Sequence, residues 1–351
     1  MNSTAHLEIV SPGAYASIQD SGRRGFRRIG VPWAGVLDPR LMRIANALVG
    51  NPGTTPVIEC FDGGLQVLAR GAAMRVAVAG DAVIEIEHAG ERKPVPAWRS
   101  ITLADGDIMR IRRMGSGRIA ALALEGLALP QVLGSASTYA RAALGGVDGR
   151  ALAAGMCLPA QAASGVERIL PQVPAAEERP IRVVRGPQAD HFSAETFETL
   201  LGSDYRVTAE ADRMGVRLEG PVLGHVGAAE IISDATVPGS IQVPGKGQPI
   251  VLLADAQTAG GYPKIATVIG SDIPRLAACR PGQTLRFAAV SAVEGERIAR
   301  ETEAETLALL AAICPFAAEG VDEAALYAVN LVSGVVHALS AEYRPLTAAE
   351  D

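Results

Sequence analysis

Short apolar segments separated by turn residues constrain the fold of this chain more than any other feature. Each segment is only a few residues long, and Gly, Pro or an Asp-Gly pair such as Asp105-Gly106 stands between one segment and the next. This length and spacing are typical of a barrel or a sandwich, and not of a regular alternation of strands and helices. Strands are therefore expected at 6–10, 57–61, 65–69, 74–79, 83–87, 100–103, 108–112 and 118–124, and then at 181–184, 205–208, 216–219, 230–232, 250–253 and 285–289.

A few helices are expected between the strands. Asp38 can cap a helix that has Pro39 at its first position, and Gly50 can end that helix. Ser193 can cap a second helix, and a third is expected at about 292–313, after the last strand. The sequence thus predicts a mainly β fold with a few helices.

One segment has the composition of a linker. Residues 171–180, PQVPAAEERP, hold three prolines and three charges and show no apolar periodicity. This linker separates a predicted N-terminal β-rich domain at 1–172 from a second β domain at 181–291. A helical extension is predicted at 292–351.

Composition and charge argue against several classes of partner. The 351 residues carry a net charge of −6, and no basic run is interleaved with aromatic residues. Nucleic acids and membrane surfaces are therefore not expected as partners. No secretory signal and no membrane-spanning segment are expected either. The cysteines are scattered and are expected to be small buried hydrophobes of a reducing compartment, which favours the cytoplasm: Cys60, Cys157, Cys279 and Cys314.

Familiar catalytic motifs are missing from the sequence. The five histidines lie far apart and the cysteines form no CxxC pair, so no metal site is expected. No GxSxG motif occurs. In GSIQVPGKG, at 239–247, five residues separate the first two glycines and Gly247 follows Lys246, which does not match a P-loop. The chain contains no Met-Lys pair, so it is not expected to carry its own biotin.

The stretch ADAQTAGGYPKIATVI, at 254–269, holds the densest group of candidate site residues. Lys264 is one of three lysines among 32 basic residues, and lysine offers a compact charge with an adjustable pKa. The Gly260-Gly261 pair can let successive backbone N–H groups converge into an anion-binding nest. A tight turn with a packed tyrosine is the alternative. Polar side chains beside the glycines add donors: Gln257, Thr258 and Tyr262.

Two further regions of the sequence are unusually polar or charged for their surroundings. A long glycine-rich loop holds Gln19, Asp20 and Arg23, and such loops are unusual without a function. Glu59 lies in the apolar run VIECF, where a buried carboxylate needs a partner and one arginine would suffice.

A third charged group follows the spacing of a strand. Arg213, Arg217 and Glu219 alternate along one predicted face. They either clamp an anion or pair with other charges on a solvated face, and the second arrangement is the more usual one.

Several stretches, taken together and in order, resemble one known family. They are QDSGRRGFRRIGVPWAGVLDP, RIANALVGNP with the following IEC, GSASTYARAALGGVDGRAL, GPQADHF, EADRMGVRLEGP and PGSIQVPGKGQPIVLLADAQTAGGYPKI. The chain is similar to the carboxyltransferase family, also described as allophanate hydrolase subunit 2, and within it to the 5-oxoprolinase C subunits and kinase-inhibitor antagonists. Ala259 stands where the family usually has threonine, and Met156-Cys157 stand where Gly-Asp is common.

The resemblance implies two cyclophilin-like β-barrel domains and a multi-subunit enzyme. It implies a second cyclophilin-like subunit, of the B type, and a third oxoprolinase subunit, of the A type. The implied reaction is the cleavage of 5-oxoproline to L-glutamate with ATP and Mg²⁺. Fold similarity alone leaves two alternatives open, a carboxyltransferase that uses biotin on another chain and a non-catalytic protein that binds a regulator.

Activation of an unreactive lactam needs donors that stabilise a developing anion more than it needs a nucleophile. The polar residues identified above are therefore assigned to the site, with no metal ligand among them. The residues predicted to be catalytic are Lys264, Tyr262, Gln257 and Thr258. Those predicted to bind substrate are Gly260, Gly261, Gln242, Arg213, Gln19, Asp20 and Arg23.

Overall fold

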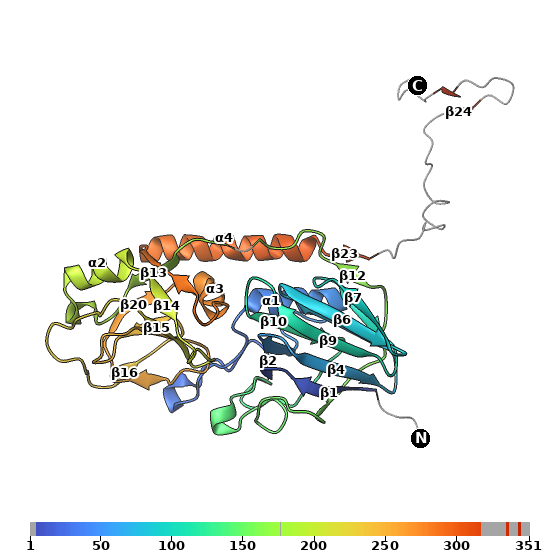
Figure 1. The fold of residues 1–351 in the computed structure, drawn as a ribbon, viewed down its shortest axis with the longest axis horizontal. Helices are drawn as coiled ribbons and strands as arrows, with labels where there is room; N and C mark the ends of the chain where they lie inside the picture. Colours follow the sequence, from blue (N-terminus) through green and yellow to red (C-terminus); the bar gives the residue numbers. More distant parts are fainter. Residues whose placement is uncertain (1–4, 176, 317–334, 337–342, 345–351) are drawn as a thin grey trace.

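The first half of the chain forms two antiparallel sheets (Figure 1). The computed structural model describes residues 5–175, 177–316, 335–336 and 343–344. Apolar side chains from both sheets, such as Leu7 and Val76, pack into one core. The six-stranded sheet contains β11 (Cys157–Pro159), β1 (His6–Pro12), β4 (Leu65–Arg70), β9 (Ile108–Met114), β6 (Ala82–His88) and β7 (Glu91–Val95), in that order. The five-stranded sheet contains β2 (Tyr15–Gln19), β3 (Val57–Phe61), β10 (Ile119–Leu124), β5 (Met74–Ala79) and β8 (Ser100–Leu103).

The second half forms a nearly closed barrel. Its two edge strands, β21 and β22, follow each other in the chain with only Arg286 between them, so the ends of the sheet meet. The sheet has eight strands, in the order β21 (Thr284–Leu285), β14 (Tyr205–Val207), β15 (Gly215–Glu219), β18 (Ile250–Leu252), β17 (Ser240–Gln242), β20 (Lys264–Val268), β13 (Ile181–Arg185) and β22 (Phe287–Ala289). The predicted mainly β architecture is confirmed.

The helices begin where the sequence predicts them. Helix α1 (Pro39–Val49) starts at Asp38, whose Oδ1 accepts hydrogen bonds from the backbone N–H groups of Arg40 at 2.9 Å and Leu41 at 3.2 Å. Ser193 caps α2 (Ala194–Gly202) in the same way, and Ser291 caps α4 (Ala292–Ala311). A short helix, α3 (Ile273–Ala277), is not predicted by the pattern. Turns of 3-10 helix lie at Arg27–Ile29 (η1), Ala140–Ala142, Ala189–His191 and Gly270–Asp272.

Helix α4 runs along both halves of the molecule (Figure 1). Its Glu303 pairs with Arg43 of α1 at 2.7 Å. Beyond the helix, β23 (Cys314–Pro315) pairs with β12 (Arg168–Ile169), so the chain returns to the first half. The prediction of a helical extension at 292–351 is wrong for β23 and for the paired strands β24 (Val335–Val336) and β25 (Tyr343–Arg344), and its remaining residues beyond 316 lie outside the described ranges.

Some predicted strands are wrong or incomplete. Residues 230–232 lie in an irregular segment, and the two isoleucines there do not enter the core: Ile232 is 95% exposed. The expected strand at 285–289 is interrupted at Arg286. Strands β2 and β20 were not expected, since buried polar residues such as Gln19 and Lys264 disguise them in the sequence. Short strands also lie at β16 (Asp234–Ala235) and β19 (Ala259–Gly260).

The cysteines follow the prediction only in part. All four are free thiols, and Cys60 and Cys279 are buried as expected. Cys157 and Cys314 are exposed, which corrects the expectation, because each lies on a short peripheral strand at the edge of a sheet. Within the described ranges, no helix combines the length and apolarity that crossing a membrane requires.

Candidate functional site

Lys264 lies at the start of β20 with its side chain inside the barrel wall. The residue is 1% exposed, which is rare for lysine. Its Nζ lies 3.0 Å from Oδ2 of Asp234, on β16 in the long segment between β15 and β17. The pair therefore joins a buried cation to a carboxylate that is itself half exposed, with 49% of its side-chain surface accessible.

Gln188 holds both members of this pair. Its Nε2 donates to Oδ2 of Asp234 at 2.9 Å, and its Oε1 accepts from the backbone N–H of Lys264 at 3.3 Å. Hydrogen bonds from Lys264 and then from Gln188 lower the pKa of Asp234 below its ordinary value. The carboxylate thus stays ionised opposite Lys264. Neither Asp234 nor Gln188 was singled out from the sequence, although Gln188 lies in the quoted stretch GPQADHF.

Two glutamines extend the polar cluster along the barrel wall. Gln257 donates from Nε2 to Oε1 of Gln242 at 3.2 Å, and Gln242 pairs in register with Lys264 between β17 and β20. Gln242 is buried, and its Nε2 finds no acceptor among the described residues. A buried donor without an acceptor is costly, so this amide is a candidate to bind a ligand oxygen. We call Lys264, Asp234, Gln188, Gln242 and Gln257 the lysine cluster.

The glycine pair does not form the predicted nest. Neither Gly260 nor Gly261 has the left-handed φ that such a nest requires. Gly260 lies in β19, which pairs with β16, and the carbonyl of Gly261 accepts a hydrogen bond from Ile231 N at 2.9 Å. The glycines therefore let two backbones approach closely instead of presenting converging N–H groups. Their assignment to substrate binding stays a prediction.

Close approach explains why Gly260 has no side chain. A Cβ at this position would lie 2.5 Å from Nε2 of Gln242. We expect Gly260→Ala to displace that amide and to lower any turnover that depends on the lysine cluster about tenfold or more, because misplaced site groups lose rate steeply. The control is Gly270→Ala, whose Cβ would meet no atom within 4 Å. Steady-state rates and melting temperatures of both variants check this, and a Gly260→Ala rate within twofold of the control would contradict it.

Residues at the edge of the cluster differ in their exposure. Tyr262 is exposed, and the backbone carbonyl of Thr258 accepts from Thr236 N at 3.1 Å.

Arg27, from the first half of the chain, donates to the carbonyl of Thr236 at 2.6 Å and to that of Gln257 at 3.4 Å. Burial lowers the pKa of Arg27. Arg27 was not singled out from the sequence, although it lies in the quoted stretch QDSGRRGFRRIGVPWAGVLDP.

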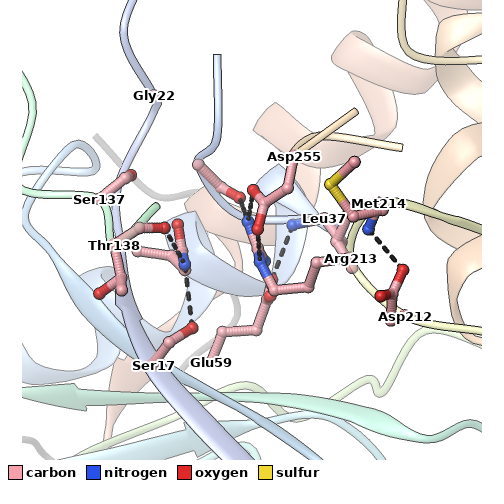
Figure 2. Close-up of polar contacts among 12 residues, drawn as sticks. Ser17, Gly22, Leu37, Glu59, Ser137, Thr138, Asp212, Arg213, Met214 and Asp255 are labelled. Atoms are coloured by element: carbon pink, nitrogen blue, oxygen red, sulfur yellow. Dashed lines mark hydrogen bonds and ion pairs between the residues drawn. The ribbon is translucent and has the colours of Figure 1, made fainter. Parts of the chain in front are cut away.

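Arg213 lies in a separate buried cluster between the two halves (Figure 2). It binds Asp255 through two hydrogen bonds of 3.0 and 3.1 Å, the carbonyl of Gly35 at 2.6 Å, and Oε1 of Glu59. The other oxygen of Glu59 accepts from Leu37 N at 2.7 Å. Burial opposes the charge of Arg213, but Asp255 and then Glu59 outweigh it and raise its pKa. The predicted arginine partner of Glu59 is therefore Arg213.

The three charged residues predicted to share one face, Arg213, Arg217 and Glu219, have different surroundings in the structure. Arg217 pairs with Glu210 at 3.0 Å, and Glu219 pairs with Arg206, in each case with more than half of both side chains exposed. These two residues follow the solvated-face interpretation. Arg213 does not share their face, because it precedes β15 and is buried. Its contacts are those of a structural bridge, and its role in substrate binding stays a prediction.

The predicted residues of the first loop form a third cluster. Oδ1 of Asp20 accepts from Gly22 N at 2.8 Å and from the hydroxyls of Ser135 and Ser137, each at 2.6 Å. Gln19 donates to Ser17 Oγ at 2.9 Å and to the carbonyl of Thr138 at 3.2 Å. Arg23 donates to the backbone carbonyls of Val132, Ser135 and Ser137. The contacts thus connect Gln19, Asp20 and Arg23 to the loop at 132–138, and not to the lysine cluster.

The described residues show no gathering of three or more His, Cys, Asp or Glu side chains that could hold a metal ion. A cavity of about 270 Å³ opens between the halves, beside Arg213. Tyr15, Tyr139 and Arg141 line it, and burial raises the pKa of Tyr15. Larger cavities lined by charged side chains lie elsewhere, one of about 420 Å³ beside Arg43 and one of about 560 Å³ beside Arg286.

A two-sheet half joined to a nearly closed barrel, with buried charges at the barrel wall and between the halves, defines a mainly β protein of the carboxyltransferase class. The profile described as "Carboxyltransferase domain, subdomain A and B" matches residues 29–289. The chain belongs to this carboxyltransferase domain family.

Named relatives fall into two groups. The chain is 35% identical to the C subunit of 5-oxoprolinase of Escherichia coli, over 82% of this chain and 92% of that protein. It is 36% identical to the C subunit of 5-oxoprolinase of Haemophilus influenzae, over 85% of this chain and 95% of that protein. Urea amidolyase of Saccharomyces cerevisiae is 28% identical over 85% of this chain, but only 17% of that protein is covered.

Solved structures share the fold of this chain. The crystal structure of TTHA0988 matches with a TM-score of 0.71 and 35% identity, over 81% of this chain and 55% of that chain. The crystal structure of the Kluyveromyces lactis urea carboxylase matches with a TM-score of 0.79 and 25% identity, over 88% of this chain and 30% of that chain. The chain therefore spans about half, or less, of the solved chains that it resembles.

Proposed function

We propose that this chain is the C subunit of an ATP-dependent 5-oxoprolinase, which acts with a partner barrel subunit to activate 5-oxoproline for cleavage to L-glutamate. The observation that carries the proposal is the length of the match. Proteins named as the C subunit of 5-oxoprolinase align over 92% and 95% of their own length, whereas the yeast urea amidolyase aligns over 17% of its length. The alignment thus covers nearly all of the C subunits but only a small part of the urea amidolyase.

The lysine cluster supports the chemistry of this proposal. When the carbonyl oxygen of a lactam is phosphorylated, negative charge develops on oxygen atoms, and fixed donors in a water-poor site stabilise it. The Nζ of Lys264 supplies a buried positive charge, and Nε2 of Gln242 is a buried donor without an acceptor in the described structure. Both groups lie on neighbouring strands of a rigid barrel wall.

The position of Asp234 gives the site a way to receive an anion. Lys264 pairs with a half-exposed carboxylate, which water can hydrate when it leaves the lysine. An anionic substrate or a phosphoryl group can then replace Asp234 at Nζ without leaving a buried charge unpaired. Asp234 is therefore the partner of Lys264 until the ligand takes its place.

The remaining components belong to the same proposal. ATP is the co-substrate and brings Mg²⁺ with it, the B-type and A-type subunits act beside this chain, and the assembly works in the cytoplasm. Biotin is not carried on this chain. The alternative with direct structural support is a biotin-dependent carboxyltransferase subunit, because the Kluyveromyces lactis urea carboxylase shares the fold.

Turnover of the assembled subunits tests the proposal. We expect the isolated chain to be nearly inactive, and its complex with the B-type and A-type subunits of the same organism to hydrolyse ATP and release glutamate only when 5-oxoproline is present. Robust turnover by the isolated chain would contradict the need for a partner. Loss of activity on addition of avidin, together with a carboxylated product, would establish the carboxyltransferase alternative instead.

A further inference from the structure

Exposed apolar side chains concentrate on one irregular segment of the barrel half. Residues 220–239 contain only the short strand β16, yet Ile232 is 95% exposed, Val222 67% and Val226 61%. Long segments with little regular structure are uncommon in compact domains and usually serve binding. Large apolar side chains that stay in water on such a segment are typical of a surface that another molecule covers.

Backbone hydrogen bonds place this segment beside the lysine cluster. Ile231 N donates to the carbonyl of Gly261 at 2.9 Å, next to the exposed Tyr262. Arg27 reaches across from η1 to the carbonyl of Thr236 at 2.6 Å, which brings the exposed Ile29 of the same turn to this surface. We call the surface formed by residues 220–239, Tyr262 and η1 the loop face. Asp234, the partner of Lys264, belongs to this face.

The loop face is held in shape despite its lack of regular structure. His225 contacts the carbonyl of Val243 through Nε2 at 2.9 Å, and Val226 N donates to the carbonyl of His191 at 2.8 Å. β16 is fixed by its pairing with β19. A surface that is ordered before binding loses less conformational freedom when a partner docks.

Charges on the loop face indicate the chemistry of its partner. Arg28 lies on the loop face, and Arg24 and Lys246 border it, Lys246 being close to Val222 through Gly247. All three cations are exposed and have no ion pair among the described residues, and the exposed Glu230 is a carboxylate of the face that is likewise unpaired. The chain as a whole is acidic, with a net charge of −6, so these cations stand out. A second copy of the chain in a two-fold dimer would set the same cations against each other, whereas an acidic partner would complement them.

We propose that the loop face is the docking surface for the partner barrel subunit, and that the partner presents an apolar centre with acidic side chains around it. The identity of the occupant rests on the proposed function. The TTHA0988 chain supports a protein occupant, because this chain matches only 55% of it and the rest is further polypeptide. Docking on this face covers Asp234 and encloses the lysine cluster, so the site is complete only in the complex.

A binding measurement with matched variants tests the proposal. Ile232→Asp places a charge on the loop face. Because the side chain is almost fully exposed, the substitution should not change the stability of the fold. The control is Val293→Asp, on α4, where the side chain is 76% exposed and lies outside the loop face. The dissociation constant of each purified variant for the B-type subunit of the same organism is measured by calorimetry, with melting temperatures recorded beside it.

We expect Ile232→Asp to weaken the complex at least tenfold and Val293→Asp to leave it within twofold of the wild type. Arg24→Glu combined with Arg28→Glu should slow association, and more so at low salt. Unchanged affinity in Ile232→Asp overturns the proposal, and so does a homodimer that this variant abolishes. The binding readout is independent of turnover, so a complex that forms on the loop face but does not consume 5-oxoproline contradicts the proposed function alone.

Discussion

Replacing Lys264 by methionine should lower turnover of the assembled enzyme about a hundredfold while leaving the protein folded. Methionine keeps an apolar stem of similar length and removes the buried cation, and loss of a preorganised charge at a reacting oxyanion costs about 3 kcal/mol. Asp234 loses its partner in this variant, but it is half exposed and water can replace the lysine. The melting temperature should therefore change little. Steady-state kinetics of the reconstituted complex beside thermal denaturation measure both effects.

The matched control for this variant is Lys93→Met. Lys93 is an exposed lysine that contacts Glu91 at 3.7 Å with more than three quarters of both side chains in water. We expect this control to keep its full rate, because a screened surface pair has little effect. If Lys264→Met retains turnover within about threefold of the control, the lysine cluster is structural and the reaction takes place elsewhere.

Replacing Arg213 by methionine should cost about 3–5 kcal/mol of the free energy of unfolding. The substitution leaves Glu59 and Asp255 in a buried position without their shared cation, and an uncompensated buried charge is strongly destabilising. The two carboxylates also come from different halves of the chain, so the loss falls on the contact between the halves. Denaturant unfolding, followed by circular dichroism, measures the change.

Two comparison variants separate the loss of charge from the loss of packing. Arg206→Met breaks the exposed pair with Glu219, so it should cost less than about 1 kcal/mol. The double variant Arg213→Met with Glu59→Gln removes one stranded charge and should recover part of the stability. If Arg213→Met were no more destabilising than Arg206→Met, the buried bridge would not hold the two halves together.

Local features of this chain could be predicted well because their causes are local. The ends of α1 and α2 depend on Asp38 and Ser193, whose side chains bond backbone groups two or three residues away. The strand at Val57–Phe61 follows from an apolar run bounded by turn residues. Ile231 and Ile232 misled the same reasoning, because an apolar residue on an interaction surface is not buried in the core.

The candidate site could be predicted only as a set of residue types. The density of donors from Gln257 to Lys264 indicates a site. The cluster around Lys264 includes two other residues that the sequence analysis assigned to the site, Gln257 and Gln242. Asp234 and Gln188 were missed because a single acidic or amide residue in a loop carries no periodic signal. The glycines were assigned to a nest, whereas the structure uses Gly260 to let the backbone approach Gln242.

Capping and apolar spacing act over a few residues, so the order of amino acids was enough to show where helices begin and that the chain is mainly β. Which charges meet depends instead on the packing of sheets and loops. Arg213 and Glu59 are 154 residues apart, and Lys264 and Asp234 are 30 apart. A pair that stays exposed is a weak surface contact, whereas a buried pair strongly constrains the fold. The sequence indicated only a set of polar residues for one site. The tertiary structure places Arg213 in a bridge between the halves and Lys264 in a separate cluster in the barrel wall.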